Sequence, residues 1–519
     1  MSTADNLAVR LLRHAADGPD RVAIRQGDLA VSYAELERQV RRAAAVLGRL
    51  DVGYGQRVAL LFPNDHSFVE ALLAVIYRGA IAVPLNTRSG RSGLQYALAD
   101  SGAGVLVAHH SLADRAASLA GDVGARVLLT DGDGWLLAGD GTHIDADPAE
   151  QAYPVRDDDV CLQPYTSGST GAPKGCLLTH GGQYWNASAV REGWQLDGSD
   201  RGLVTAPLYH KNAMICVVKP LLLCGGTIVV GESPEPRSIP AEVERHACTY
   251  TTGVPATYEL LLESGEHERR DLSSLRFVIC GSAPLSEEFG SRAARSLGVP
   301  VIEAYGLTEG GPQVLMTPRD AKPRYGKAGK VMPGGEVRLL DVEDMPATAV
   351  ADVPEVPLGE VGEMWVRNPG VTVGYFGLPE VTAKRISVDG WLRTGDLGAR
   401  DADGYYQVLG RRDDMMNVGG ENVYPTEVEK LLLTMPQVRQ AVVVAMPHPR
   451  KGEVPAAFVK ADGVTEDEVK AHCLDHGAAH AHPRRVWFVD EYPLGGTGKI
   501  DRAALTERAA ELGQEGTAT

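Results

Sequence analysis

The stretch Y-T-S-G-S-T-G-A-P-K-G at residues 165–175 is the most informative segment of this sequence. Gly168 and Gly171 let the backbone curl so that successive N–H groups point at one anion. Hydroxyl side chains and the ammonium of Lys174 add further donors. The G-x-x-x-x-G-K-[ST] spacing of a Walker A loop is absent. The segment follows a strand-like stretch and precedes an apolar stretch typical of a helix. We therefore predict a polyphosphate-binding loop, and not a flexible glycine–serine linker.

Short apolar segments alternate with helical patterns on both sides of this loop, which is typical of an α/β protein with a mostly parallel sheet. The strand-like segments are residues 57–61, 80–84, 202–206, 226–230, 277–280 and 299–303. After about residue 325, short strands dominate and predict a β-rich subdomain. From residue 424 the pattern predicts a compact α+β unit. Residues 111–158 are rich in Asp, Gly and Ala, and we expect them to form a surface insertion.

Composition excludes several classes of protein. The 519 residues are 44% hydrophobic and 23% charged, as in ordinary globular proteins and unlike disordered or fibrous chains. The net charge of −17 argues against nucleic acid as a partner. Seven cysteines without CxxC spacing predict neither a disulfide framework nor a zinc cluster. The least polar stretch, residues 213–230, contains Lys219 and Pro220 and predicts a buried helix and strand, not a membrane span. We expect a cytoplasmic protein without a membrane partner.

Further segments occur in a characteristic order along the chain. They are S-Y-A-E-L at 32–36, V-P-L-N-T-R at 83–88, P-L-Y-H at 207–210, E-A-Y-G-L-T-E at 303–309, L-R-T-G-D-L at 392–397, G-R-R-D-D at 410–414 and P-L-G-G-T-G-K-I at 493–500. Together with the loop they resemble the motifs of the adenylate-forming (ANL) superfamily, in particular its class I acyl-CoA synthetases, the AMP-dependent acid–CoA ligases. The resemblance implies an α/β fold. Residues 1–412 would form a large N-terminal domain of two α/β subdomains plus a β-rich subdomain. Residues 413–519 would form a small mobile α+β C-terminal domain.

The resemblance also implies a reaction: ATP-dependent activation of a carboxylic acid to acyl-AMP, followed by transfer to CoA, with ATP, Mg²⁺ and CoA as cofactors. Its ATP site would comprise Thr166, Ser167, Gly168, Ser169, Thr170, Lys174, Gly281, Ser282, Ala283, Glu303, Ala304, Tyr305, Gly306, Asp396 and Arg411. Its catalytic residues would be Lys499, Thr308, Glu309 and His210.

Individual roles follow from the same resemblance. Lys499 would reach the nascent acyl–phosphate oxygens, and Glu309 would bind Mg²⁺, which favours one or two carboxylates plus phosphate oxygens. Thr308 would contact the α-phosphate, Tyr305 would stack on adenine, and Asp396, supported by Arg411, would accept both ribose hydroxyls. Taken alone, Lys499 fits a solvated surface charge and Asp396 fits a turn cap.

The acyl pocket implied by the resemblance contains Tyr184, His210, Lys211, Asn212, Gly281 and Gly306. Many ligases of fatty or aryl acids carry apolar residues where this chain has Lys211 and Asn212. We therefore expect a small or polar acid as the substrate. Lys219 lies within an apolar run, so we expect it either to snorkel to solvent or to pair with an acid.

The resemblance implies that Asp413 is the hinge about which the small domain rotates. Arg88, Lys451 and Arg484 are the expected CoA contacts. Ala481 stands where CoA-using relatives commonly have a lysine, so a second interpretation remains. It is a stand-alone adenylating enzyme that passes its acyl group to a carrier protein or an amine, including enzymes that activate nitrite for diazotisation. A third is a catalytically inactive homologue that acts as a binding protein. We expect a monomer or a homodimer.

Overall fold

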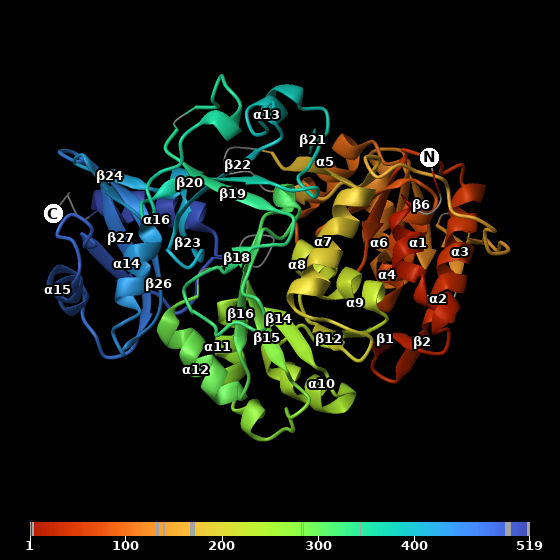
Figure 1. Ribbon diagram of the computed structural model, residues 1–519, viewed down its shortest axis with the longest axis horizontal. Coiled ribbons are helices and arrows are strands. Elements are labelled where there is room, and N and C mark those ends of the chain that lie inside the picture. The colour runs from red at the N-terminus through yellow and green to blue at the C-terminus, as the bar shows by residue number, and fades with distance from the viewer. Residues whose placement is uncertain are drawn as a thin grey trace.

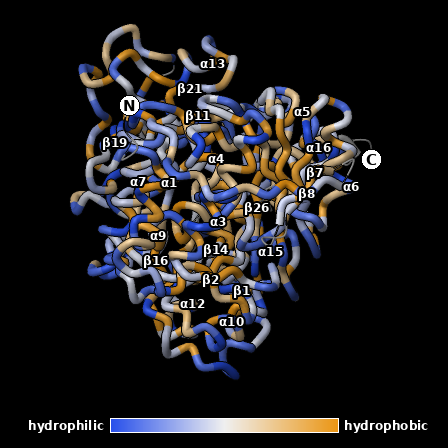
Figure 2. The backbone as a smooth tube through the Cα atoms, turned by 90° about the vertical axis from the view of Figure 1, so that its right-hand side faces the viewer, coloured by the Kyte–Doolittle hydropathy of each residue, from blue (hydrophilic) through white to orange (hydrophobic). Residues whose placement is uncertain are grey.

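A computed structural model of the chain describes residues 2, 5–130, 134–138, 141–166, 172–281, 283, 285–342, 344–493 and 500–515. Figure 1 shows the N-terminal part, in red, and the C-terminal part, in blue, at opposite ends of the molecule. Figure 2 shows hydrophobic stretches gathered in the interior and hydrophilic stretches along the outer loops. The architecture is mixed α/β, with a large N-terminal domain and a small C-terminal domain, as predicted.

The first sheet is built around parallel strands near the N-terminus. Its described strands, in spatial order, are β10 (Tyr165–Thr166), β11 (Lys174–Thr179), β9 (Val160–Leu162), β4 (Ile81–Pro84), β3 (Arg57–Leu61), β5 (Val105–His109), β6 (Arg126–Thr130), β7 (Trp135–Leu137) and β8 (Thr142–His143), with β21 (Gly374–Tyr375) beside β11. Helix α4 (His66–Tyr77) contacts β3, β4 and β5 of this sheet and β1 of the next. Because α4 has packed neighbours on all sides, its residues 67–77 are all buried and hydrophobicity extends around the helix.

The expectation of a surface insertion at residues 111–158 is wrong. This segment contains α6 (Ala113–Gly121), β6, β7 and β8, and β6 pairs with β5 in the parallel core. Leu119 and Leu128 are fully buried. Acidic and small residues dominate the composition, but the few leucines and valines of α6 and β6 point inward and determine the fold of the segment.

The second sheet is also largely parallel. Its described strands, in spatial order, are β18 (Lys330–Val331), β17 (Leu315–Met316), β16 (Val301–Tyr305), β15 (Phe277–Gly281), β14 (Tyr250–Gly253), β12 (Arg201–Val204), β13 (Thr227–Val230), β1 (Val22–Gln26) and β2 (Leu29–Ser32). The principal helices of this region are α3 (Tyr33–Arg49), α7 (His180–Gly193), α10 (Ile239–His246), α11 (Pro255–Glu263) and α12 (Glu287–Leu297). Strands β12, β14, β15 and β16 run parallel, so their carboxyl ends meet at one edge. In open α/β sheets that edge is where ligands bind.

The β-rich subdomain is a four-stranded antiparallel sheet within the described residues. Its strands are β19 (Glu336–Leu340), β20 (Gly362–Arg367), β22 (Leu392–Arg400) and β23 (Tyr406–Arg411). Trp365 and Trp391 are buried within it. Figure 1 shows this sheet above the second parallel sheet and beside the small domain, and β22 contacts the turn that follows β16.

The small domain has a hydrophobic core of its own, which runs from Met416 to Ala509. Its described strands are β25 (Glu421–Val423), β24 (Met416–Val418), β27 (Gly452–Ala461), β26 (Val438–His448) and β28 (Arg485–Phe488), and its helices are α14 (Pro425–Leu432), α15 (Glu466–His476) and α16 (Arg502–Glu515). No helix in the described part of the chain is both long and apolar enough to cross a membrane. All seven cysteines carry free thiols.

Candidate active site

The two ends of the phosphate loop are held by an antiparallel strand pair. Thr166 of β10 lies opposite Lys174 of β11, and the loop leads into strand β11 before helix α7 begins at His180. The predicted helix-like stretch after the loop is therefore a strand, because Cys176 and Leu178 alternate into the core. The loop residues Ser167, Gly168, Ser169 and Thr170 lie outside the described residues.

Glu309 lies beside the start of this loop. It belongs to a 3₁₀ turn, Thr308–Gly310, that follows the carboxyl end of β16. Its Oε1 accepts a hydrogen bond from the Thr166 hydroxyl at 3.1 Å and another from the Tyr375 hydroxyl at 3.0 Å. Burial and the Glu309 carboxylate raise the pKa of Tyr375, so that hydroxyl stays protonated as a donor. A single carboxylate with hydroxyl neighbours, beside a phosphate loop, fits a magnesium ion bound together with a polyphosphate.

A second polar cluster joins β16 to the β-rich subdomain. Asp396, which is buried on β22, lies opposite Arg411 on β23, and the Arg411 guanidinium donates to Asp396 Oδ1 at 3.2 Å. The Tyr305 hydroxyl donates to Asp396 Oδ2. Burial, followed by the Asp396 charge, raises the pKa of Tyr305 far above its usual range. Each carboxylate oxygen has a further lone pair, so Asp396 can still accept from two ribose hydroxyls.

The ends of β15 and β16 form the wall between these clusters. Gly281 pairs with Ala304, and a Cβ atom added at Gly281 would lie 2.9 Å from the Ala304 carbonyl oxygen. Only glycine fits this close approach. Ala283 is exposed, and Ser282 lies outside the described residues. The predicted nucleotide residues Tyr305, Asp396 and Arg411 are thus brought together at this edge.

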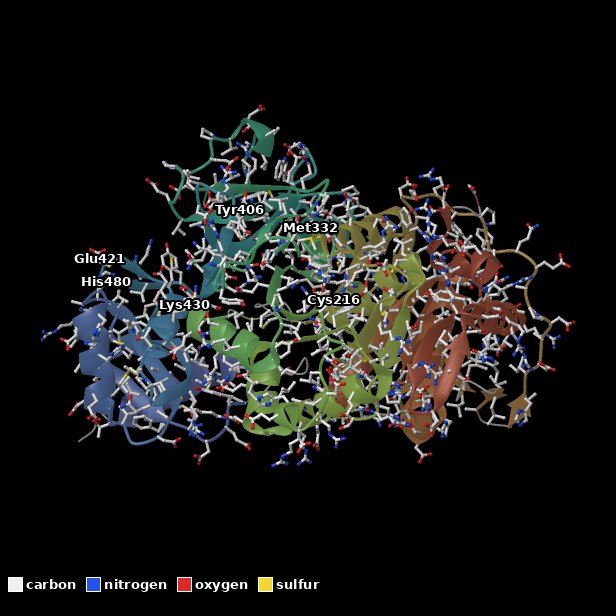
Figure 3. All side chains as sticks on the ribbon, turned by 60° about the horizontal axis from the view of Figure 1, so that its bottom comes forward. Cys216, Met332, Tyr406, Glu421, Lys430 and His480 are labelled. Carbon is white, nitrogen blue, oxygen red and sulfur yellow. The ribbon has the colours of Figure 1, made fainter. Side chains whose placement is uncertain are left out.

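Glu303 lies apart from this group. Its carboxylate accepts a hydrogen bond from the Gly326 N–H at 2.7 Å and faces Lys430 of the small domain. Figure 3 shows Lys430 at the boundary between the small domain and the rest of the molecule. Burial raises the pKa of Glu303 to about 8. Its position suits a contact between domains better than a contact with a nucleotide.

A small pocket lies between the helix that follows His210 and the ends of β15 and β16. Its lining residues are Lys211, Asn212, Ile215, Cys216, Ile279, Gly281, Ala304, Tyr305, Gly306, Pro312 and Gln313, and its open volume is about 30 Å³. Figure 3 shows Cys216 in the middle of the molecule. Of the predicted acyl-pocket residues, Lys211, Asn212, Gly281 and Gly306 line it. His210 instead caps the helix through Nδ1, and the Tyr184 ring lies under the Arg10 guanidinium at 4.5 Å.

The helix that lines this pocket is irregular for a sequence reason. It runs from α8 (Lys211–Ala213) through a π-helical turn (Met214–Val218) into α9 (Lys219–Cys224). Pro220 has no N–H to donate to the Cys216 carbonyl, and the Tyr250 hydroxyl donates to that carbonyl at 3.0 Å. A π-helical turn shifts the helix face, which places Ile215 and Cys216 along the pocket.

The expectation that Lys219 snorkels or pairs with an acid is wrong. Lys219 is 2% exposed, and its ammonium donates to the side-chain oxygen of Gln183 on α7. Burial lowers the pKa of Lys219 to about 8. The hydrogen bond to the Gln183 oxygen thus takes the place of the expected acid.

Of the three expected CoA contacts, the structure groups Lys451 and Arg484 in the small domain. Burial lowers the pKa of His482, and the charges of Arg484 and Lys451 beside it lower the pKa further. An adjacent cavity of about 270 Å³ is lined by residues of α14 and α15 and by His480, Ala481 and His482. Arg88 lies in the N-terminal domain, where its backbone N–H donates to Asn86 at 2.9 Å.

The expected hinge lies between two anchored segments. Arg412 donates to Glu363 of the β-rich subdomain at 2.8 Å, while Met416 is the first residue of the small-domain core. Asp413 belongs to a 3₁₀ turn, Arg412–Asp414, between them. Lys499 lies outside the described residues.

Two neighbours of the site were not predicted from the sequence. Tyr375, which bonds Glu309, lies in a glycine-flanked segment far from the recognised motifs. Gln313 lines the pocket from the segment after Glu309. The position of Gln313 just beyond the 303–309 motif is the one signal that could have indicated it.

Comparisons with known proteins agree with this geometry. The AMP-binding enzyme family matches residues 11–376, and the AMP-binding enzyme C-terminal domain matches residues 427–499. A feruloyl-CoA synthase from an Amycolatopsis species is 40% identical over 96% of this chain and 98% of its own length. A sulfoacetate–CoA ligase from Cupriavidus necator is 31% identical over 97% of this chain and 98% of its own length.

Solved structures give the same result. The crystal structure of ATP-bound MatB from Rhodopseudomonas palustris superposes with a TM-score of 0.89 at 30% sequence identity, covering 99% of this chain and 100% of that chain. The order of motifs, the two polar clusters at one sheet edge and these similarities lead to one assignment. This chain belongs to the AMP-binding enzyme family, the adenylate-forming AMP-dependent ligases.

Proposed function

We propose that this protein is an acid–CoA ligase that activates a small or polar carboxylic acid. In the first step the acid's carboxylate oxygen attacks the α-phosphorus of ATP, and pyrophosphate leaves. In the second step the CoA sulfur loses its proton and attacks the acyl carbonyl carbon, and AMP leaves. The names of the relatives support an acid and CoA as substrates.

The observation that carries this proposal is the meeting of two polar clusters at the carboxyl ends of β15 and β16. Thr166, Lys174 and Glu309 suit the phosphates of ATP, and Asp396 with Arg411 suits its ribose. Glu309 would hold Mg²⁺, which when bound would supply positive charge to the phosphate oxygens. Lys499 would add a cation where charge develops on the acyl and phosphate oxygens, an effect worth roughly 3–4 kcal/mol.

The neighbouring pocket is where the acyl group would lie. Its small volume and the polar side chains of Lys211, Asn212 and Gln313 favour a small or polar acid over a long alkyl chain. A buried amide left unpaired by an alkyl chain costs roughly 1–3 kcal/mol.

A second candidate function follows from Ala481. This residue packs against the small-domain core and supplies no cation beside the cavity near Lys451 and Arg484. An enzyme that passes the acyl group to a carrier protein or an amine, or that activates nitrite, does not need that cation.

One experiment separates the two functions. AMP release is measured against CoA concentration for the wild type, Ala481→Lys and Arg88→Ala. If CoA is the acceptor, Ala481→Lys should lower its Michaelis constant and Arg88→Ala should raise it, without a change in pyrophosphate release. Each charge-assisted contact is worth about 1.5–3 kcal/mol when well formed. A flat response in all three proteins would reject CoA in favour of the second function.

A further inference from the structure

We propose that the pocket behind the reacting carboxylate recognises a second anionic group, so that the substrate is a short dicarboxylic acid or a sulfonated carboxylic acid. The recognising groups are the ammonium of Lys211 and the side-chain amides of Gln313 and Asn212. This inference rests on the proposed acid–CoA ligase function and narrows its substrate class.

Lys211 supplies the positive charge. It opens α8 and lines the pocket, and its Nζ donates to the Gly306 carbonyl on the opposite wall. The described residues that line the pocket include neither Asp nor Glu. A charged ammonium in a wall without acids favours an anion inside the pocket.

Gln313 independently indicates that a ligand oxygen lies in the pocket. It is 3% exposed, and its Nε2 has no hydrogen-bond partner within the described structure. Its Oε1 already accepts from the Cys216 thiol at 3.9 Å, so the amide is oriented with the nitrogen as its remaining polar atom. Buried amide nitrogens are seldom left unpaired, and an oxygen of a ligand in the pocket would satisfy this one.

The side-chain amide of Asn212 is held in the same way as that of Gln313, by a hydrogen bond to its oxygen. Its Oδ1 accepts from the Thr252 hydroxyl at 2.8 Å, which leaves the amide nitrogen as the donor. The pocket is thus lined by three side chains with N–H donors, one of them charged, and its other side walls include Ile215 and Ile279. Carboxylate and sulfonate groups are pure acceptors with several lone pairs, which is the complement of this set.

The volume limits the size of the acid. A space of about 30 Å³ corresponds to roughly two water molecules by the same measure. A short chain with a terminal anion suits so small a space better than an aromatic ring or a long alkyl chain.

The test compares matched pairs of acids that differ in charge but hardly in shape. Succinate is paired with succinamate, and sulfoacetate with 3,3-dimethylbutyrate. Pyrophosphate release gives kcat/KM for each acid with the wild type, Lys211→Met, Gln313→Leu and a control, Lys322→Met, at an exposed position. Thermal melting of each variant checks that it is folded.

We expect the wild type to prefer the charged member of at least one pair by about 10- to 100-fold. Lys211→Met should remove most of that preference, Gln313→Leu should reduce it, and Lys322→Met should leave it unchanged. The pair that responds distinguishes a carboxylate from a sulfonate.

Two results would overturn the proposal. One is a wild type that prefers the neutral acid in both pairs. The other is a Lys211→Met variant that loses activity equally on both members, since Lys211 would then serve the reacting carboxylate. Activation of ferulate without either charged acid would reject this proposal alone. Absence of pyrophosphate release with every acid, ferulate included, would reject the ligase function and this inference with it.

Discussion

Replacing Glu303 by glutamine is expected to make the protein more stable than the wild type, by a margin that grows as pH rises. Glu303 is 8% exposed, and burial raises its pKa from 4.5 to about 8. A carboxyl with a raised pKa binds its proton more tightly in the folded state than in the unfolded state. Its contribution to stability is therefore complete below pH 4.5 and is lost as pH rises from there through about 8.

The magnitude follows from the two pKa values. Because the unfolded chain loses this proton at a lower pH than the folded one, stability falls from its low-pH value by about 2 kcal/mol at pH 6 and by about 5 kcal/mol at pH 9, as upper-range figures. Glutamine keeps the oxygen that accepts from the Gly326 N–H and has no charge to bury. The advantage of the variant over the wild type should therefore grow by about 3 kcal/mol between pH 6 and pH 9, or about 2–4 °C in Tm for a domain of this size.

The assay is thermal melting of the wild type and Glu303→Gln at pH 6 and at pH 9. Glu360→Gln, at an exposed position, is the matched control and should show the same difference from the wild type at both pH values. Lys430→Met should raise the pKa of Glu303 further, because the Lys430 charge lowers that pKa. A Glu303→Gln advantage that is equal at pH 6 and pH 9 would refute the reasoning.

Three further predictions concern the reaction. Lys499→Ala should lower acyl-AMP formation by about 100- to 1,000-fold, while thioester formation from supplied acyl-AMP should survive better. The two half-reactions are measured separately. An equal loss in both would contradict a small domain that alternates between two orientations. Asp413→Pro should still form acyl-AMP but transfer it orders of magnitude more slowly, because proline fixes φ near −65° in the turn between the domains; unchanged overall turnover would exclude Asp413 as the hinge. Asn212→Leu should shift kcat/KM toward apolar acids by about tenfold, since it removes a polar side chain that accepts from Thr252 at 2.8 Å beside the pocket. A wild type that prefers long-chain fatty acids would contradict a polar acyl pocket.

Local patterns in the sequence were sufficient for much of the fold. Within the predicted α+β unit, helix α15 begins at Glu466 because Thr465 and Glu468 form a capping box at its start. The buried parallel strands β3 and β15 follow from their apolar runs, since residues buried on both faces of a sheet are mostly hydrophobic. For residues 111–158 composition is a poor guide, because acidic and small residues outnumber the few leucines and valines that fill the core.

For the site, the sequence determined the chemistry, and the tertiary structure decided the neighbours. The glycines, hydroxyls and lysine of residues 165–175 indicate a phosphate loop because all of these residues lie next to one another in the chain. Tyr375 beside Glu309, Gln313 within the pocket and Lys430 opposite Glu303 come from distant parts of the chain, and their roles depend on contacts that no local pattern records. Burial is also decided by the tertiary structure. The free energy of a charge depends on how much water surrounds it, so the domains that pack around a carboxyl such as Glu303 decide whether it keeps its ordinary pKa.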